Sequence, residues 1–273
     1  MGVKETFDWV TREWGIIARR DEMSLADAAR WLRQWVPFGA KTIGYGTVSL
    51  TAGPLTPDYQ ASAWAQKQWS RSALEGLRIT AEVHGEHLVP GGGLMYASNH
   101  QSLLDILVLG AVLPGDLKWA TKRSIMNVPF LGWHLRLAGH VPVDRQAGSR
   151  AAAETIKRFV TVLEQGKPLL VFPEGTRSDD GEIHDFKNGG FYAAVRAGVP
   201  VVPVALEGTH QLMGKHAVDA GDHLRPRHVV VRIGEALHAN QDGKERDRVA
   251  DLRDRCHAAV VDLHGQIRAA ASL

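Results

Sequence analysis

The sequence has a single cysteine, and this scarcity excludes two kinds of site. Cys256 has no second cysteine in the 273-residue chain with which to form an internal disulfide, and one thiol cannot supply the thiolate ligands of a structural zinc site. Histidines spaced for a metal are also missing, because His84 and His87 flank Gly85 beside a strand end without further ligands nearby. We therefore expect no metal site.

Long apolar runs are absent as well. The nearest candidate, residues 36–55, is interrupted by Lys41, four glycines and several threonines, whereas a membrane-spanning helix needs about 20 mostly apolar residues. The first 20 residues also lack the basic and then apolar segments of a signal peptide. We expect a cytoplasmic protein whose contact with a membrane is peripheral.

A large excess of charge of one sign is lacking too. The 32 Lys and Arg residues against 30 Asp and Glu residues give a formal net charge of +2, which argues against a nucleic-acid-binding protein defined by its overall charge. Neither a P-loop nor a glycine fingerprint for dinucleotides is found. What remains is the composition of a soluble globular protein, long enough to bury a sizeable core.

The first 75 residues are predicted to be helical. Apolar residues recur at helical spacing in three segments: Phe7, Val10, Trp14 and Ile17; Leu25, Ala28, Leu32 and Trp35; Trp64, Trp69, Ala73 and Leu77. Residues 39–57, rich in Gly, Thr and Pro, are predicted to form a loop or a mobile link. Six of the eight tryptophans lie in these helices, where they suit either the membrane interface or the packing of the helices on the main domain. We expect residues 1–75 to be an N-terminal amphipathic extension and a candidate membrane-interface element.

From residue 78 the pattern changes to alternating strands and helices. Strands are predicted at residues 79–83, 93–98, 117–120, 140–143, 168–172, 201–206 and 229–233, and helices at 103–113, 151–165, 188–197 and 245–270. This alternation predicts an α/β domain over residues 76–273, with a single mixed sheet flanked by helices.

Two polar turns follow predicted strands. In the first, His100 precedes a helix and Asp105 lies in its first turn, so the two side chains can meet. A lone histidine beside a turn is more often structural. Here Asn99, Ser102 and Asp105 crowd the same turn, and a carboxylate that holds one imidazole nitrogen leaves the other to act as a general base.

The second turn, residues 172–178, can face the same crevice, because the loops at the carboxyl ends of α/β strands build the site. Gly175 allows a ligand to approach the backbone, and the Arg177 guanidinium matches phosphate oxygens. A surface turn with a salt bridge between Glu174 and Arg177 is the alternative. Three basic residues that adjoin turns suggest an anionic ligand: Lys122, Arg145 and Lys187. For Arg123, Arg136 and Arg150, a solvent-exposed basic face is the better interpretation.

Four stretches in this order resemble the motifs of the glycerolipid acyltransferases, above all the bacterial 1-acyl-glycerol-3-phosphate type. They are residues 99–105 (NHQSLLD), 122–145 with Pro129, Gly132, Gly139 and Asp144-Arg145, 172–178 (FPEGTRS) and 199–203 (VPVVP). The resemblance covers about residues 78–233 and does not extend to the first 75. Ser124 departs from a frequent glutamate, and residues 141–143 are more proline-broken than usual, which bears on headgroup or donor preference.

The resemblance implies the family's fold and a reaction that needs no cofactor. His100, held by Asp105, would take the proton from the free hydroxyl of a lysophospholipid as that oxygen attacks an acyl thioester, and the Gly175 N–H would donate to the developing oxyanion. The implied substrate-binding residues are Asn99, Ser102, Lys122, Arg145, Glu174, Gly175, Thr176, Arg177 and Lys187.

The implied acceptor is 1-acyl-glycerol-3-phosphate, which would give phosphatidic acid, with acyl-CoA or acyl carrier protein as donor. The expected partners are these substrates and the cytoplasmic face of a membrane, and no nucleic acid. The apolar stretch 125–133 would line an acyl-chain tunnel, touch lipid or pack in the core. Three alternatives stay open: a different lyso-lipid acceptor, a lipid hydrolase that uses the same His and Asp, and a non-catalytic lipid-binding protein.

Overall fold

The computed structural model describes residues 25–144, 148–215 and 227–271. The expected first helix, over residues 7–17, and Arg145 lie outside this part of the chain. The described residues form one seven-stranded sheet in the order β1-β7-β6-β2-β5-β3-β4. Its strands are β1 Ile79–His84, β2 Met95–Ser98, β3 Lys118–Lys122, β4 Val141–Val143, β5 Leu169–Val171, β6 Val201–Glu207 and β7 Arg227–Ile233.

The sheet is mixed, as expected. Strands β6 and β7 pair in antiparallel fashion, and all other neighbouring strands are parallel. The carboxyl ends of β2, β3, β4 and β5 therefore lie along one edge of the sheet, where the expected site residues follow these strands.

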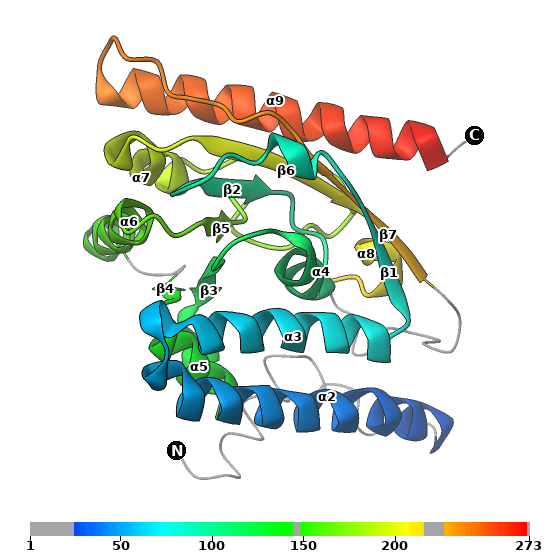
Figure 1. Cartoon of the computed structure of the whole chain (residues 1–273). Coiled ribbons are helices and arrows are strands. Elements are labelled where there is room, and N and C mark those ends of the chain that lie inside the picture. The colour runs from blue at the N-terminus through cyan, green and yellow to red at the C-terminus, as the bar shows by residue number, and fades with distance from the viewer. Residues whose placement is uncertain (1–24, 145–147, 216–226, 272–273) are drawn as a thin grey trace.

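Helices cover both faces of the sheet (Figure 1). Helices α6, α7 and α9 lie over one face; α4 and α3 lie over the other, with α2 packed outside α3. The helices are α2 Leu25–Ala52, α3 Gln60–Gly76, α4 Leu104–Val112, α5 Leu131–Leu137, α6 Ser149–Glu164, α7 Gly189–Ala197, α8 Thr209–Leu212 and α9 Glu245–Ala271, and short 3₁₀ helices are η2 Gly53–Leu55, η3 Pro57–Tyr59, η4 Glu86–Leu88 and η5 Arg123–Asn127. None of the described helices is both long and apolar enough to cross a membrane.

Two apolar clusters hold the layers together, one on each face of the sheet. Successive side chains of a strand point to opposite faces, and in β2 Tyr96 joins the cluster on the α3 and α4 side, whereas Met95 and Ala97 join the one on the α6, α7 and α9 side. Burial on both faces explains why the central strands are apolar throughout. It also explains why the sequence located them: every predicted strand and helix from residue 79 onward is present.

The predicted loop over residues 39–57 is wrong, because α2 continues through Pro37 as far as Ala52. Tertiary packing overrides the weak helix propensity of this segment. Gly46 lies so close to α5 that a Cβ there would come within 2.9 Å of the Cβ of Phe130, so the glycine allows contact rather than a turn. The Thr42 hydroxyl donates to the carbonyl of Phe38 one turn earlier (2.8 Å).

The two tryptophans of α3 differ in their exposure. Trp69 of α3 is buried in the same core as α4 and packs near Trp119 of β3, with 6.1 Å between ring centroids. Trp64, also on α3, is 54% exposed. Packing on the sheet domain therefore accounts for Trp69, and the exposed face that carries Trp64 needs another explanation.

Candidate active site

The two polar turns meet at the carboxyl ends of β2 and β5. His100 follows β2 and precedes α4, and Asp105 lies in the first turn of α4, as the spacing predicted. The His100 Nδ1 and Asp105 Oδ2 are 2.7 Å apart, and both side chains are buried. A carboxylate at Nδ1 sets the orientation of the imidazole and leaves Nε2 as the nitrogen that can exchange a proton with a substrate.

The Asp105 carboxylate is held from several sides. Its Oδ2 also accepts hydrogen bonds from the backbone N–H groups of Gln101 (2.7 Å) and Ser102 (2.9 Å). Its Oδ1 accepts one from the hydroxyl of Thr209 (2.6 Å), a residue of α8. A buried carboxylate needs such donors because burial removes its hydration. The result is a carboxylate fixed in position before any substrate binds.

The second turn docks directly on His100. The Phe172 ring stacks on the imidazole with 4.0 Å between centroids and 16° between planes. The Glu174 Oε1 accepts the His100 backbone N–H (2.8 Å), and the Ser178 N–H donates to the His100 carbonyl (2.7 Å). The first motif therefore supplies His100, and the second contacts both the backbone and the ring of that histidine.

Glu174 is a buried carboxylate whose two oxygens accept hydrogen bonds from backbone N–H groups. Besides His100, it accepts the backbone N–H of His184 at Oε2 (3.1 Å). Burial raises the pKa of Glu174 above its usual range, and these two backbone hydrogen bonds oppose that shift. The contacts of Glu174 tie the second turn to the first; the sequence-based alternative of a salt bridge with Arg177 is not among them.

Asn99 and Ser102 are buried and bonded to backbone groups. The Asn99 side chain donates to the Leu206 carbonyl (3.0 Å) and accepts from the Leu206 N–H (2.9 Å). The Ser102 hydroxyl donates to the Met213 carbonyl (2.6 Å) and accepts from the Leu104 N–H (3.1 Å). Both side chains thus attach the turn of residues 99–105 to the segment that runs from β6 through α8.

Gly175 sits in a left-handed conformation with φ of +77°. Its N–H donates to the Phe172 carbonyl (3.0 Å), so this N–H is used inside its own turn, and its donation to an oxyanion stays a prediction. The close approach that the sequence predicted at Gly175 is present, but the group that approaches is Lys187: a Cβ on Gly175 would be 2.5 Å from Nζ. The Lys187 N–H in turn donates to the Pro173 carbonyl (2.9 Å).

The other expected substrate contacts lie along the same edge of the sheet. Lys122 is exposed at the end of β3, Thr176 is exposed and Arg177 is half-buried in the turn after β5. Arg145 follows β4, and its position is not described. The parallel order β2-β5-β3-β4 places these strand ends next to one another. Within the described residues, no group of three or more His, Cys, Asp or Glu side chains could hold a metal ion.

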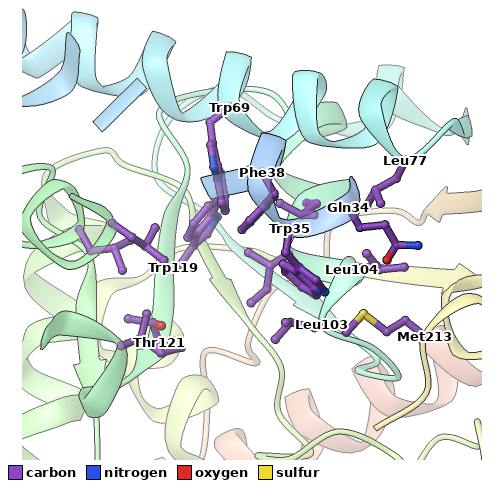
Figure 2. Close-up of a pocket in the computed structure, with 15 residues that line it drawn as sticks. Gln34, Trp35, Phe38, Trp69, Leu77, Leu103, Leu104, Trp119, Thr121 and Met213 are labelled. Atoms are coloured by element: carbon purple, nitrogen blue, oxygen red, sulfur yellow. The ribbon is translucent and has the colours of Figure 1, made fainter. Parts of the chain in front are cut away.

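An apolar pocket adjoins the turn of residues 99–105. Its walls include Leu103 and Leu104 of that turn, and Figure 2 shows Trp35, Phe38 and other side chains projecting into the same space. The lining is Gln34, Trp35, Phe38, Trp69, Leu77, Leu103, Leu104, Ile106, Leu107, Trp119, Thr121, Ile125, Leu131, Leu135 and Met213. Such a lining suits a hydrocarbon chain. Ile125 and Leu131 come from the stretch predicted to line an acyl-chain tunnel.

Comparison with known proteins decides the family. The family described as Acyltransferase matches residues 80–207. The 1-acyl-sn-glycerol-3-phosphate acyltransferase of Pseudomonas aeruginosa is 31% identical over 249 residues, which cover 90% of this chain and 94% of that protein. The chain belongs to the acyltransferase family.

Further relatives extend the likeness of this acyltransferase beyond its motifs. A 1-acyl-sn-glycerol-3-phosphate acyltransferase of Saccharomyces cerevisiae is 31% identical over 189 residues, covering 68% of this chain and 60% of that protein. The crystal structure of the 1-acyl-sn-glycerophosphate acyltransferase PlsC from Thermotoga maritima matches with a TM-score of 0.73 and 25% identity, over 88% of this chain and 95% of that one. Coverage of this extent includes part of the first 75 residues, so the expectation that the resemblance begins near residue 78 is wrong.

Two contacts of the acyltransferase site were missed from the sequence. Phe172 stood within a recognised motif, but nothing indicated that its ring would stack on His100. Thr209 lies 104 residues from Asp105, outside every motif, and no local pattern marks it. Only a predicted pairing of β6 with β2 would have brought Thr209 near the turn of residues 99–105.

Proposed function

We propose that this acyltransferase moves an acyl chain from an acyl thioester to the free hydroxyl of 1-acyl-glycerol-3-phosphate, which gives phosphatidic acid. The observation that carries the proposal is the buried His100 and Asp105 pair, 2.7 Å apart, beside an apolar pocket and at a sheet edge that ends in cations. The activity for which the relatives are named supports the choice of acceptor.

In the proposed reaction, His100 Nε2 takes the proton from the acceptor hydroxyl as that oxygen attacks the thioester carbonyl carbon. The tetrahedral intermediate collapses, the C–S bond breaks, and the proton on the imidazole passes to the leaving thiolate. The products are an ester and a free thiol, so atoms and charge balance without a cofactor. No enzyme nucleophile is needed because the substrate supplies it, and the burial that raises the pKa of the Cys256 thiol to about 12 keeps that thiol protonated.

The phosphate of the acceptor is proposed to bind at the cationic edge formed by Arg177, Lys187 and Lys122. Arg145, which lies outside the described residues, stays a further candidate from the sequence. Arg177 offers a planar fork to two phosphate oxygens, whereas the lysines act as point charges. The Lys187 side chain lies over Gly175, which places its charge beside the turn that docks on His100.

The acyl chain of one substrate is proposed to occupy the apolar pocket. The lining of the pocket is apolar, which suits a hydrocarbon chain, and the pocket wall formed by Leu103 and Leu104 begins three residues after His100. A thioester carbonyl at the mouth of the pocket would therefore lie near the base.

Attachment to the cytoplasmic face of a membrane is proposed for the outer face of α2 and its neighbours. Large apolar side chains are exposed there: Leu32, Val36, Ile43, Val48, Leu55, Tyr59, Trp64 and Trp133. Exposed apolar residues of this kind suit a lipid interface. Co-sedimentation with anionic lipid vesicles should weaken in Val36→Glu, but not in Val261→Glu, which changes an exposed valine of α9. Equal binding by both variants would contradict this assignment.

The function is tested by a matrix of acceptors and donors on the purified full-length chain. Lysophospholipids that differ in headgroup are each offered with acyl-CoA and with acyl-acyl carrier protein, and the ester product is measured. Fastest turnover of 1-acyl-glycerol-3-phosphate supports the proposal, and preference for another headgroup supports the lyso-lipid alternative. Free fatty acid released without an acceptor, at a rate equal to acyl transfer, would indicate the hydrolase instead.

A further inference from the structure

Three residues of the segment 206–213 contact residues 99–105, here called the catalytic turn because it carries the proposed base His100 and its partner Asp105. Leu206 at the end of β6 exchanges two hydrogen bonds with the Asn99 side chain, and the Met213 carbonyl accepts the Ser102 hydroxyl. Between these contacts, the Thr209 hydroxyl donates to Asp105 Oδ1 at 2.6 Å. The segment therefore holds the catalytic turn by its backbone at both ends and by the catalytic carboxylate in the middle.

We infer that Thr209 is a positioning residue that sets the plane of the Asp105 carboxylate and, through it, the orientation of the His100 imidazole. Oδ2 receives His100 and two backbone N–H groups. Among the described residues, Thr209 is the side chain that holds Oδ1, and it is fully buried together with Asp105. Without the hydroxyl, a charged oxygen is left buried with no donor, and the carboxylate turns to recover one.

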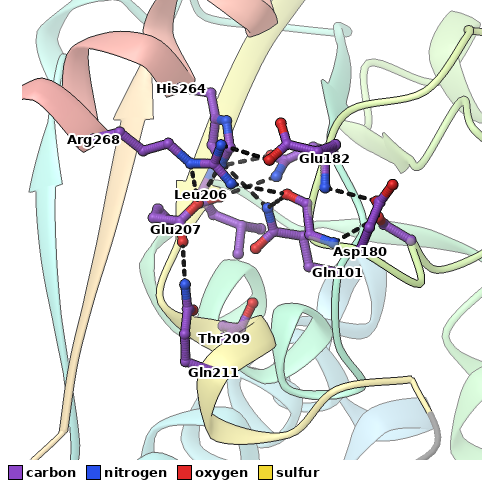
Figure 3. A network of polar contacts seen from close by, with 12 residues as sticks. Gln101, Asp180, Glu182, Leu206, Glu207, Thr209, Gln211, His264 and Arg268 are labelled. Carbon is purple, nitrogen blue, oxygen red and sulfur yellow. Dashed lines mark hydrogen bonds and ion pairs between the residues drawn. The ribbon is translucent and has the colours of Figure 1, made fainter.

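The residues on either side of Thr209, Glu207 and Gln211, belong to a network that reaches the last helix, α9 (Figure 3). Glu207 pairs with His264 of α9, and its Oε1 accepts the Gln211 side chain of α8 (2.7 Å). Burial alone would raise the pKa of Glu207, but hydrogen bonds from His264 and Gln211 outweigh it and lower the pKa to about 2. A carboxylate that stays charged at neutral pH can keep α8 in place.

The same network contacts the catalytic turn from a second side. The Gln101 side chain donates to the Gly181 carbonyl (2.9 Å) and lies 3.2 Å from His264 Nε2, and Figure 3 shows Arg268 directed to the same group of residues. Thr209 therefore belongs to a segment that is bonded to α9 as well as to the turn of His100. The anchor on α9 gives Thr209 a fixed point outside that turn from which to hold Asp105.

The inference rests on the proposed roles of His100 and Asp105. Two substitutions separate the effect of the Thr209 hydroxyl from the effect of the side-chain volume. Thr209→Val keeps the side-chain volume and removes the hydroxyl, whereas Thr209→Ser keeps the hydroxyl. We expect kcat of Thr209→Val to fall roughly 10- to 100-fold, as small misplacements of catalytic groups do, with KM for the acceptor unchanged within about twofold. Thr209→Ser should retain most of the wild-type kcat.

The measurement is steady-state kinetics with the acceptor that the matrix selects, beside thermal unfolding of each variant. Thr155→Val is the matched control, because its hydroxyl bonds to a helix carbonyl of α6 (3.0 Å) away from the site. Wild-type kcat in Thr209→Val, or equal losses in Thr209→Val and Thr209→Ser, would overturn the inference. If Thr209→Val does not fold, Thr209→Ala takes its place under the same criteria.

The same assays distinguish failure of the proposed function from failure of the inference about Thr209. If His100→Ala retains wild-type activity, the proposed base is wrong and the role of Thr209 fails with it. If His100→Ala is inactive and Thr209→Val is not impaired, the inference about Thr209 alone fails.

Discussion

The backbone N–H of His100 donates to the carboxylate of Glu174 at 2.8 Å, across 74 residues of sequence. Two motifs that are far apart in the chain are therefore a single structural unit, and the second one shapes the turn that carries the proposed base. This relationship gives Glu174 a structural role beside any contact with substrate.

Glu174→Gln is expected to lower both stability and activity. Each carboxylate oxygen of Glu174 accepts one backbone N–H, from His100 and from His184, and glutamine would place an NH₂ donor against one of these donors. Leaving a buried backbone N–H without an acceptor costs about 1–3 kcal/mol. Urea unfolding should show this loss of stability. The control is Glu154→Gln, which changes an exposed glutamate of α6. An unchanged free energy of unfolding would mean that these hydrogen bonds contribute nothing net.

His100→Ala is expected to reduce acyl transfer by roughly 100- to 10,000-fold, the usual contribution of a general base. Folding should be nearly intact, because the His100 backbone contacts with Glu174 and Ser178 remain. The matched control is His184→Ala, an exposed histidine near the same turn. Product formation in a timed radiochemical assay decides the matter: activity above a few per cent of wild type would exclude His100 as the base.

Gly175→Ala is expected to cost more activity than Gly139→Ala, although both glycines have φ of +77°. The backbone strain of an alanine is the same at both positions, about 1 kcal/mol. At Gly139 nothing lies within 4 Å of an added Cβ, whereas at Gly175 the Cβ would be 2.5 Å from Lys187 Nζ. The displaced lysine should raise KM for a phosphate-bearing acceptor. Equal KM values in the two variants would argue against phosphate binding by Lys187.

A pair of buried histidines is expected to make stability depend on pH. Burial lowers the pKa of His134 to about 4, with the Lys118 cation adding to the shift, and burial lowers the pKa of His140 well below its usual value. Unfolded histidine titrates near 6.5. Between pH 6.5 and 4 the unfolded chain therefore binds more protons than the folded one, so these histidines make stability fall as the pH decreases through this window.

His134→Gln should remove the contribution of one of these two histidines to the pH dependence of stability. The slope of unfolding free energy against pH should decrease by about 1.4 kcal/mol per unit within the window, because His140 still contributes its own. Urea unfolding between pH 7.5 and 4.5 measures the slope, and His84→Gln, at an exposed histidine, is the control. A slope equal to that of the wild type would show that His134 is protonated in the folded state.

The sequence by itself determined most of the sheet domain and the two turns. The central strands are apolar on both faces, and local periodicity marks such segments. The position of His100 before α4 followed from residue spacing alone, as did the presence of Asp105 in the first turn. These features depend on neighbours within a few residues.

The tertiary structure decided what depends on distant contacts. Helix α2 runs through a glycine- and threonine-rich segment because it packs against α3 and α5, a gain that local propensity does not contain. The N–H of Gly175 is used inside its own turn. Thr209 reaches Asp105 across 104 residues, because the pairing of β6 with β2 brings their carboxyl ends together. The sequence pattern indicates the pair His100 and Asp105, whereas the donors that hold Asp105 are brought to it by the tertiary structure.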